Sequence, residues 1–394
     1  MKILFHFPDW GNVVQNRQYQ KNDSRIYPVL LAMQATYMKQ QGNIVYWDEP
    51  LHLKYDHIII ESKFATHHLA EQIKKEYPQT EILGECVGTG VSRLSPREFL
   101  DLPAPDRILT KWKKYSENGN YKYLPGTHMQ AARDCWYGKC SFCSWAQLYP
   151  KDSYSRRTPE SMIDEVIQCY HLGIREIFDD SGTFPTGKWL EQFCNLMKQS
   201  GMNKHVKISC NMRFGVSTPH DFDMMKEAGF RMILWGLEQY DQFTLAMLNK
   251  GISVTMICDD LVKAKRAGLE NHVAVMYGYP WLMPMHEQTT YLFVKAMMLQ
   301  GIVDSVQATI FIPYPNTPIY KFLMDRREIR TYDRSKYDMQ QSVVKGWYNP
   351  KELIRKTYRI ALHPRFLWHQ LKQIKSIDDL KFYARALKKI RARL

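Results

Sequence analysis

Three cysteines lie close together in the segment Cys135-Trp-Tyr-Gly-Lys-Cys140-Ser-Phe-Cys143, with four residues in the first gap and two in the second. This spacing lets three thiolates converge on one soft metal centre, and thiolates favour zinc or iron–sulfur clusters. Gly138 and Lys139 suit a short loop that folds around such a centre. The segment therefore predicts a metal-binding loop.

Three kinds of site are compatible with these cysteines. A structural zinc site needs a fourth ligand, and His128 is the nearby candidate. A [2Fe–2S] site of the plant ferredoxin type needs a distant fourth cysteine, for which Cys169 is nearest. A [4Fe–4S] cluster held by three cysteines would leave one iron open to bind a substrate or cofactor. We favour this third interpretation.

Before the cysteines, strand-length and helix-length apolar segments alternate, which is typical of a Rossmann-like parallel sheet. We expect this domain to span residues 1–108 and a linker to span 109–126. Such sheets bind ligands at the carboxyl ends of their strands. Residues 8–24 and Gly88-Thr-Gly90 follow the first and fourth expected strands, so we expect them to contact a ligand there.

From residue 127 the alternation resumes and continues to residue 315, with about six strand–helix repeats. A partial (β/α)6 barrel of the TIM type is the natural closure, and in such barrels the reactive groups gather at the carboxyl ends of the strands. The polar ends of the expected strands are Asp179-Asp180-Ser181, Arg213, Glu238 and Tyr277-Gly278. Each has a structural alternative, since Asp and Ser also cap helices or fill turns and an arginine also serves as a surface cation.

In their order and spacing, these motifs resemble the radical S-adenosylmethionine (SAM) superfamily, in particular the subfamily with an N-terminal cobalamin-binding domain. Phe142 stands just before the last cysteine, as in that family, and Trp-Gly-Leu-Glu238 and Tyr277-Gly-Tyr-Pro resemble its fourth-strand and fifth-strand motifs. There are three departures. The family usually has three residues between its first two cysteines, whereas this chain has four. The N-terminal domain is also short, and it lacks an Asp-x-His-x-x-Gly motif.

The resemblance implies a role for each motif. Cys135, Cys140 and Cys143 would bind a [4Fe–4S] cluster. Asp179, Asp180 and Ser181 would bind the amino group of SAM, and Arg213 would bind its carboxylate. Glu238 would bind the ribose, and Tyr277 and Gly278 would bind the adenine. Phe142 would lie beside the cluster. One electron would then cleave SAM and release a 5′-deoxyadenosyl radical, with the protein supplying orientation and exclusion of water.

The same resemblance implies cobalamin as a second cofactor and methyl transfer as the reaction. Without cobalamin, the radical would serve a rearrangement, cyclisation, dehydrogenation, or RNA or peptide modification. We expect a small-molecule or peptide substrate and an external electron donor such as flavodoxin or ferredoxin. The alternative outside this family is a non-catalytic iron–sulfur protein or a nucleic-acid-binding protein.

Composition limits the class of protein further. The chain has 394 residues, of which 45% are hydrophobic and 24% charged, as is usual for a globular protein. No apolar run is long enough to cross a membrane, and the first residues are too short an apolar run for a signal peptide. Eight cysteines without a disulfide-like pattern favour a cytoplasmic location, and we expect the five outside the loop to be buried apolar groups: Cys86, Cys169, Cys194, Cys210 and Cys258.

The C-terminal segment, residues 316–394, is predicted to be mostly helical and basic. Residues 351–394 hold thirteen Lys and Arg against three Asp and Glu, so most of the net charge of +14 lies there. Apolar residues recur at helical spacing in this segment. We expect a helix packed on the barrel by one apolar face, with a membrane-surface helix and a nucleic-acid-binding arm as the alternatives.

Overall fold

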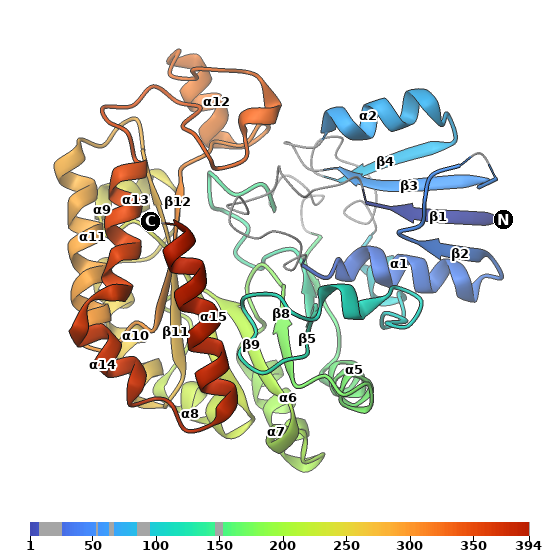
Figure 1. Cartoon of the computed structure of the whole chain (residues 1–394), viewed down its shortest axis with the longest axis horizontal. Helices are drawn as coiled ribbons and strands as arrows, with labels where there is room; N and C mark the ends of the chain where they lie inside the picture. The colour runs from blue at the N-terminus through green and yellow to red at the C-terminus, as the bar shows by residue number, and fades with distance from the viewer. Residues whose placement is uncertain (8–25, 53, 63–66, 85–94, 146–152, 394) are drawn as a thin grey trace.

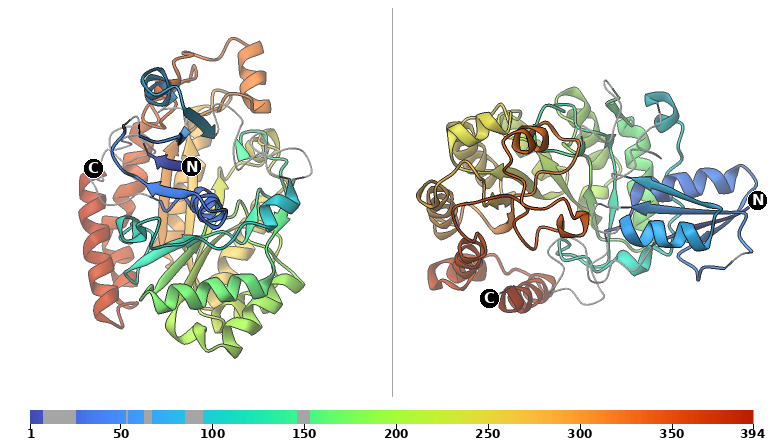
Figure 2. Two further views of the ribbon diagram at one scale, coloured as in Figure 1. Left: turned by 90° about the vertical axis from the view of Figure 1, so that its right-hand side faces the viewer. Right: turned by 90° about the horizontal axis from the view of Figure 1, so that it is seen from above.

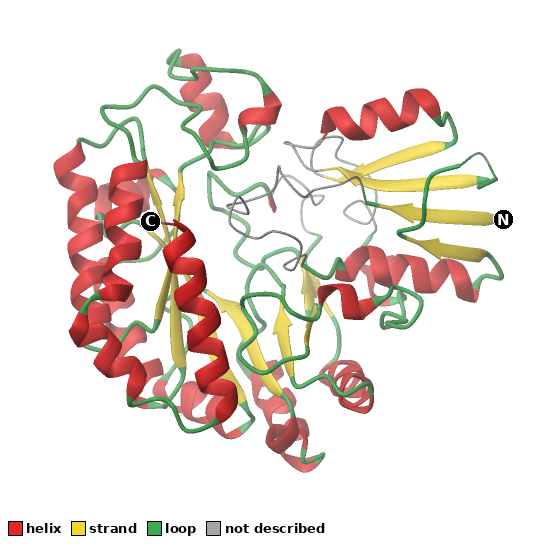
Figure 3. Ribbon diagram, in the orientation of Figure 1, coloured by secondary structure: helices red, strands yellow, loops and turns green. Residues whose placement is uncertain are grey.

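Two parallel sheets with helices around them form the fold (Figure 1). A computed structural model describes residues 1–7, 26–52, 54–62, 67–84, 95–145 and 153–393. Coloured by secondary structure, the ribbon shows helices on both sides of the N-terminal sheet and along the outer side of the second sheet (Figure 3). This arrangement confirms the α/β fold predicted from the alternation of strand-length and helix-length segments.

The N-terminal sheet has four parallel strands in the order β2-β1-β3-β4. Helices α1 and α2 cover its opposite faces because alternate side chains of β1 point to opposite sides. Ile3 and Phe5 pack with α1, whereas Leu4 packs with Ala70 of α2. The elements are β1 (Lys2–His6), α1 (Val29–Gln40), β2 (Ile44–Trp47), β3 (His57–Ser62), α2 (His67–Glu76) and β4 (Thr80–Gly84).

The strand order of this sheet reverses between β1 and β3, so a ligand site is expected at the carboxyl ends of these two strands. The segments that we expected to contact a ligand, residues 8–24 and Gly88-Thr-Gly90, lie outside the described residues. Cys86 lies outside them as well. The topology therefore agrees with the expected site, while its ligand contacts stay a prediction.

The second sheet is a half-barrel of six parallel strands in the order β12-β11-β10-β9-β8-β5, with neighbours in sequence also neighbours in space. Viewed from the side and from above, the sheet curls, with the N-terminal domain beside it (Figure 2). Its strands are β5 (Gly126–Met129), β8 (Glu176–Asp179), β9 (Lys207–Met212), β10 (Phe230–Glu238), β11 (Glu270–Tyr277) and β12 (Ser305–Ile310).

The helices between these strands begin at clear sequence signals. Thr158 and Thr218 each accept a backbone N–H bond from the third residue of the following helix, and a proline follows each of them. The helices are α5 (Pro159–His171), α6 (Lys188–Gln199), α7 (Met202–His205), α8 (Pro219–Glu227), α9 (Gln242–Met247), α10 (Val254–Arg266) and α11 (Pro284–Leu299).

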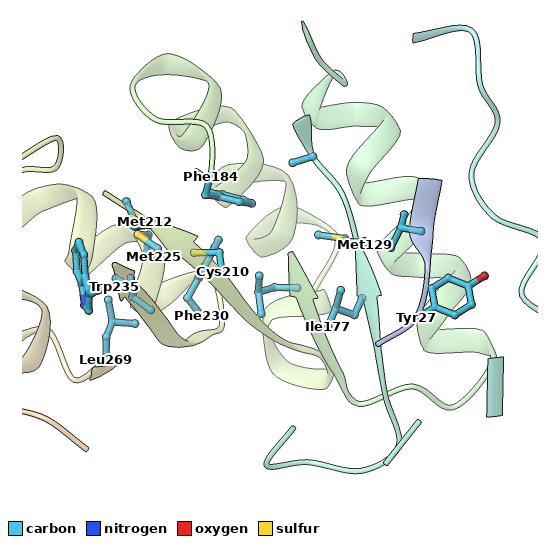
Figure 4. Packing of buried hydrophobic residues seen from close by; sticks show 14 of the residues in the cluster. Tyr27, Met129, Ile177, Phe184, Cys210, Met212, Met225, Phe230, Trp235 and Leu269 are labelled. Carbon is cyan, nitrogen blue, oxygen red and sulfur yellow. The ribbon is translucent and has the colours of Figure 1, made fainter. Parts of the chain in front are cut away.

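Apolar side chains between the strands and the outer helices form the main core (Figure 4). Trp235 of β10 stacks on Phe214, with their ring centroids 4.5 Å apart, and its indole N–H donates to Asn271. The seven cysteines that the structure describes form no disulfide. Cys169, Cys194 and Cys210 are buried as predicted, whereas Cys258 is half-buried.

The segment that links the two sheets, which includes Arg107, is anchored by a buried ion cluster. Arg107 donates to Glu165 of α5 at 2.6 Å and to the carbonyl of His128 at 3.0 Å. Arg157 pairs with the other oxygen of Glu165. Burial alone would raise the pKa of Glu165, but the two arginines outweigh burial and lower it. Glu165 therefore stays charged and holds the linker against the barrel.

The C-terminal segment crosses the open side of the half-barrel (Figure 1). Its helices are α12 (Pro318–Asp325), α13 (Lys351–Arg359), α14 (Pro364–Leu371) and α15 (Ile377–Arg393). The short helix α3 (Pro96–Leu100) lies earlier in the chain, between β4 and the predicted linker. This confirms the predicted helical, basic segment and its packing on the barrel: Ile390 packs against the main core. None of the helices in the described ranges combines the length and the apolar character needed to cross a bilayer.

We predict that Glu165→Gln lowers the free energy of unfolding by about 3 kcal/mol, because two buried guanidinium groups lose their counter-charge. Chemical denaturation at neutral pH measures the change. Since the pKa of Glu165 is lowered, its stabilisation is present above its unfolded pKa and is lost as the pH falls through its folded pKa. The exposed Glu160 on the same helix supplies the control, and an equal loss of stability in Glu160→Gln would contradict this explanation.

Candidate active site

The cysteine loop leaves the barrel at the carboxyl end of β5 and is closed by a two-stranded antiparallel ladder. In this ladder β6 (Ala132–Arg133) pairs with β7 (Ser155–Arg156), so the chain leaves and re-enters at one point. The loop is also tied to the end of α9. Ser141 donates its backbone N–H to the carbonyl of Leu248, and Asn249 donates to the carbonyl of Lys139. Both ends and the middle of the loop are therefore held.

The three thiols of this loop lie close enough to influence one another. Cys135, Cys140 and Cys143 are half-buried, and the charges of Cys135 and Cys140 act on Cys143. Burial raises the pKa of Cys140, and it raises the pKa of Cys143 to about 12. Thiols that resist ionisation in this way need a metal or cations nearby to become thiolates.

Within the described residues, no group of three or more His, Cys, Asp and Glu side chains is placed to share a single metal ion. Three sulfurs on one zinc ion would have to lie roughly 4 Å apart. A [4Fe–4S] cluster makes a different demand, since each thiolate binds a different iron. The three thiols in one closed loop fit such a cluster with one open iron.

The end of β8 carries the cysteine loop. A Cβ added to Gly182 would lie 2.8 Å from the Cβ of Cys135 and 3.2 Å from the carbonyl of Asp134. Asp179 accepts the backbone N–H of Ala131 at 2.7 Å, and Ser181 accepts that of Ala132 at 2.9 Å. Two of the predicted SAM ligands, Asp179 and Ser181, thus hold the strand that leads into the loop.

Burial raises the pKa of the Asp179 carboxyl to about 6, although hydrogen bonds from Ser181 and Ala131 lower it again in part. Its carboxylate is fully buried and faces backbone amides. Asp180 next to it is half-buried, and its backbone N–H donates to the carbonyl of Met129. Of the three predicted residues, Asp180 therefore has the most accessible side chain.

A buried ion pair lies beside the loop at the end of β10. Glu238 accepts a bond of 2.8 Å from Lys250, whose Nζ lies 5.6 Å from the centroid of the Phe142 ring. Burial alone would lower the pKa of Lys250, but Glu238 and Cys140 outweigh burial and raise it. A Cβ at Gly236 would lie 2.6 Å from the Glu238 carboxylate. This geometry brings Phe142 and Glu238 together and adds Lys250, a cation that sequence reasoning did not assign.

Arg213 also faces the loop. Its guanidinium carbon lies 3.5 Å from the centroid of the Tyr137 ring, and one nitrogen donates to the carbonyl of Gly251 at 2.9 Å. The charge of Arg213 also acts on the Cys140 thiol. The predicted cation at the end of β9 is thus stacked on the loop itself and is not a free surface arginine.

The turn after β11 is held by a buried carboxylate. Glu287 of α11 accepts the backbone N–H groups of Gly278 and Tyr279 and the hydroxyl of Tyr348. Burial raises the pKa of Glu287 to about 7. Tyr277 points its side chain away from the barrel mouth into the core, where its hydroxyl meets Thr357 at 3.0 Å. Only its backbone is available to a ligand at this turn.

A cavity of about 600 Å³ adjoins the same turn, with Gly278 and Tyr279 in its wall. Three cations, Arg330, Lys336 and Lys351, also line it.

The alternative ligands for the cysteine loop lie in other surroundings. His128 bonds to Tyr121, and Cys169 is buried beside Arg107 and Glu165.

The model of the radical SAM superfamily matches residues 129–284, from the end of β5 to the start of α11. Residues 129–284 of this chain are thus similar to the radical SAM superfamily. The match contains the whole cysteine loop and the ends of β8, β9, β10 and β11. This match confirms, for residues 129–284, the resemblance stated from the sequence, and these residues form most of the half-barrel.

Two curated relatives resemble this chain. An uncharacterized methyltransferase of Pyrococcus horikoshii is 26% identical over 264 residues, which cover 66% of this chain and 55% of the relative. An anaerobic magnesium-protoporphyrin IX monomethyl ester cyclase of Cereibacter sphaeroides is 26% identical over 261 residues, which cover 64% of this chain and 39% of the relative. The chain thus spans about half or less of the length of these relatives.

Solved structures share the fold. The cobalamin-dependent SAM radical enzyme OxsB, with aqua-cobalamin and SAM bound, aligns with a TM-score of 0.65 at 12% identity over 100% of this chain and 71% of its own. The radical SAM methyltransferase TsrM of Kitasatospora setae, with cobalamin and a [4Fe–4S] cluster bound, aligns with a TM-score of 0.59 at 12% identity over 84% of this chain and 76% of its own. At such identity the likeness establishes the architecture.

Several residues of the half-barrel that contribute to the site were not assigned from the sequence. Gly182 and Lys250 stand inside the segments Asp-Asp-Ser-Gly and Leu-Asn-Lys-Gly, so the motifs contained them. Their roles depend on which segments meet in space. Glu287 offered no signal, because a glutamate in the first turn of a helix is common.

We predict that Gly182→Ala reduces cluster loading, because the new methyl group would push Cys135 away from the turn that follows β8. The iron and sulfide content after anaerobic reconstitution measures the loss, and the melting temperature shows whether the fold survives. Gly346→Ala is the matched control, since its added Cβ meets nothing closer than 3.9 Å. Full loading of Gly182→Ala would show that the loop does not depend on this contact.

Proposed function

We propose that this chain binds a [4Fe–4S] cluster through Cys135, Cys140 and Cys143 and uses it to form a 5′-deoxyadenosyl radical that abstracts hydrogen from a substrate. The observation that carries the proposal is the closed thiol loop resting on Gly182 at the carboxyl edge of the half-barrel. Such a cluster, when reduced, supplies through its open iron the electron that splits SAM into methionine and the radical.

The surrounding residues would bind and orient SAM. Glu238, held by Lys250, has carboxylate oxygens that suit ribose hydroxyls. Arg213 suits the carboxylate of the methionine part, because a guanidinium pairs well with a carboxylate. The side chains of Asp179 and Ser181 are already bonded to backbone amides. We assign the amino group to Asp180, whose side chain is the most accessible of the three, and to the backbone carbonyls at the end of β8.

The turn at Gly278 would support the adenine. Its φ of +93° and its bonds to Glu287 fix the backbone there. The cavity beside it, with its three cations, would accept part of a small-molecule or peptide substrate. An external donor such as flavodoxin or ferredoxin would supply the electron. We also propose a cytoplasmic location, on the basis of the cysteine pattern of the sequence.

Methyl transfer with cobalamin is the reaction that we propose, supported by the N-terminal sheet and its likeness in fold to two structures that contain cobalamin. One curated relative is named a methyltransferase. Another relative, at the same identity, is named a cyclase, which favours cyclisation without methyl transfer as the second candidate. The presence of a bound corrin separates the two.

We predict about four irons and four sulfides per chain after anaerobic reconstitution, and formation of 5′-deoxyadenosine from SAM under reducing conditions. Cys135→Ala, Cys140→Ala and Cys143→Ala should each lose the iron and sulfide and the formation of 5′-deoxyadenosine. Cys258→Ser should keep the cluster and the activity.

The SAM-binding assignment has its own variant. Glu238→Gln should keep the cluster and weaken SAM binding by about tenfold, since charge-assisted hydrogen bonds contribute roughly 1.5–3 kcal/mol. Two irons per chain with a dependence on Cys169 would instead indicate a ferredoxin-type site. Unchanged SAM affinity in Glu238→Gln would remove that residue from the SAM site even if the cluster is present.

For the corrin, we predict that protein produced with cobalamin supplied and then desalted keeps its visible absorption bands at about one corrin per chain. The N-terminal sheet, whose strand order reverses at β1 and β3, is the expected site. The half-barrel alone, if it folds, is not expected to keep corrin. Absence of corrin from the full chain, with SAM cleavage retained, would favour cyclisation or rearrangement.

A further inference from the structure

A second cavity, of about 400 Å³, lies between α15 and the first residues of β10, β11 and β12, at the opposite end of these strands from the cysteine loop. Met232 and Val306 of the sheet and Leu387 and Ile390 of α15 contribute to its mainly apolar wall. Its size is within the range of roughly 300–1,000 Å³ that is typical of small-molecule sites. Nothing in the proposed SAM reaction uses it.

Of the four charged residues in the wall of this cavity, Arg385 donates to the carbonyls of Tyr121 and Lys122, and the other three form ion pairs. Arg231 binds Glu270 at 2.6 Å and also Glu176, and Asp304 binds Lys265 at 2.5 Å. A ligand that lies here therefore meets a mainly apolar wall in which the charges of Arg231, Glu270 and Asp304 are compensated. Such a wall suits a hydrocarbon chain, which gains free energy on leaving water and has no polar groups to satisfy.

The cavity reaches the surface at the turn between α14 and α15. Leu371 lines the cavity and is 59% exposed. Around the same turn Trp368, Ile377 and Leu380 are 57%, 73% and 58% exposed. We call these four residues the apolar corner. Large apolar side chains, with a tryptophan among them, are typical of surfaces that insert into the interface of a bilayer.

The charges around the apolar corner are sorted by direction. The acidic residues Asp378 and Asp379 bind Arg175 at 2.8 Å and Lys122 at 2.9 Å on the barrel. Lys372 and Lys375 are exposed, and in the described part of the chain neither forms an ion pair. The Lys372 ammonium lies 5.0 Å from the centroid of the Trp368 ring. The corner therefore presents cations beside apolar groups, which complements an anionic lipid surface.

We propose that this cavity binds the hydrocarbon chain of an anionic membrane lipid, with the lipid headgroup beside Lys372 and Lys375 at the apolar corner. A nucleic acid would use the cations but not the exposed apolar side chains or the cavity. A lipid uses all three features. This binding is separate from the cluster and SAM, and it gives the basic C-terminal segment a ligand of defined chemistry.

The first experiment measures binding of the full, cluster-loaded chain to vesicles of phosphatidylcholine, alone or mixed with phosphatidylglycerol. We expect binding only to the mixed vesicles. Lys372→Glu with Lys375→Glu should weaken it at least about 30-fold, since each cation near the surface contributes roughly 1 kcal/mol. Lys74→Glu with Lys75→Glu, exposed on α2, is the matched control and should bind normally. Equal binding to both kinds of vesicle, or tighter binding to RNA, would overturn the proposal.

The second experiment tests the cavity with a soluble short-chain phosphatidylglycerol and native mass spectrometry. We expect one lipid per chain, lost in Ala386→Phe, whose new ring would fill the cavity. Gln307→Phe fills it from the sheet side and serves if Ala386→Phe does not fold. Iron content and SAM cleavage should stay unchanged in every variant that folds. Binding of a free fatty acid without vesicle binding, or lipid retained by both filled variants, would contradict the assignment.

Discussion

The contact between Cys135 and Gly182 constrains everything at the carboxyl edge of the half-barrel. Any side chain at residue 182 would begin 2.8 Å from the Cβ of Cys135, so the loop can occupy its place only above a glycine. The same turn supplies Asp179 and Ser181, which bind the amides of Ala131 and Ala132. The end of β8 thus supports the loop from below and fixes the direction from which the chain enters it.

The carboxyl edge of the half-barrel must also supply positive charge to the thiols of the cysteine loop. Half-buried thiols resist ionisation, as the raised pKa values of Cys140 and Cys143 show. Lys250 and Arg213 supply positive charge to Cys140, and each is held from a different strand end. Glu238 keeps Lys250 in place and charged. The site therefore depends on several strands ending at one edge, which is a property of the parallel barrel and not of the loop alone.

Much of this architecture could be predicted from the sequence, because local spacing encodes it. The cysteine gaps, the proline after Thr158 and Thr218 and the alternation of segments need no knowledge of distant contacts. The direction of a side chain does need it. Tyr277 belongs to the expected turn, yet β11 alternates half-buried and buried residues, and Tyr277 falls on the buried, outward side. The pairing of Lys250 with Glu238 and of Glu287 with Gly278 likewise depends on which elements the fold brings together.

The exposed cations beside the apolar corner are related to how the half-barrel is closed. An open six-stranded sheet must cover its edge, and α15 does this partly through ion pairs made by Asp378 and Asp379 with cations of the barrel. Asp378 and Asp379 of α15 point toward the barrel, whereas Lys372 and Lys375 of the same helical hairpin are exposed. Closure through polar contacts at the end of the helix also leaves the space beside Leu387 and Ile390 incompletely filled. An exposed cationic corner and an apolar cavity are therefore two results of one packing arrangement.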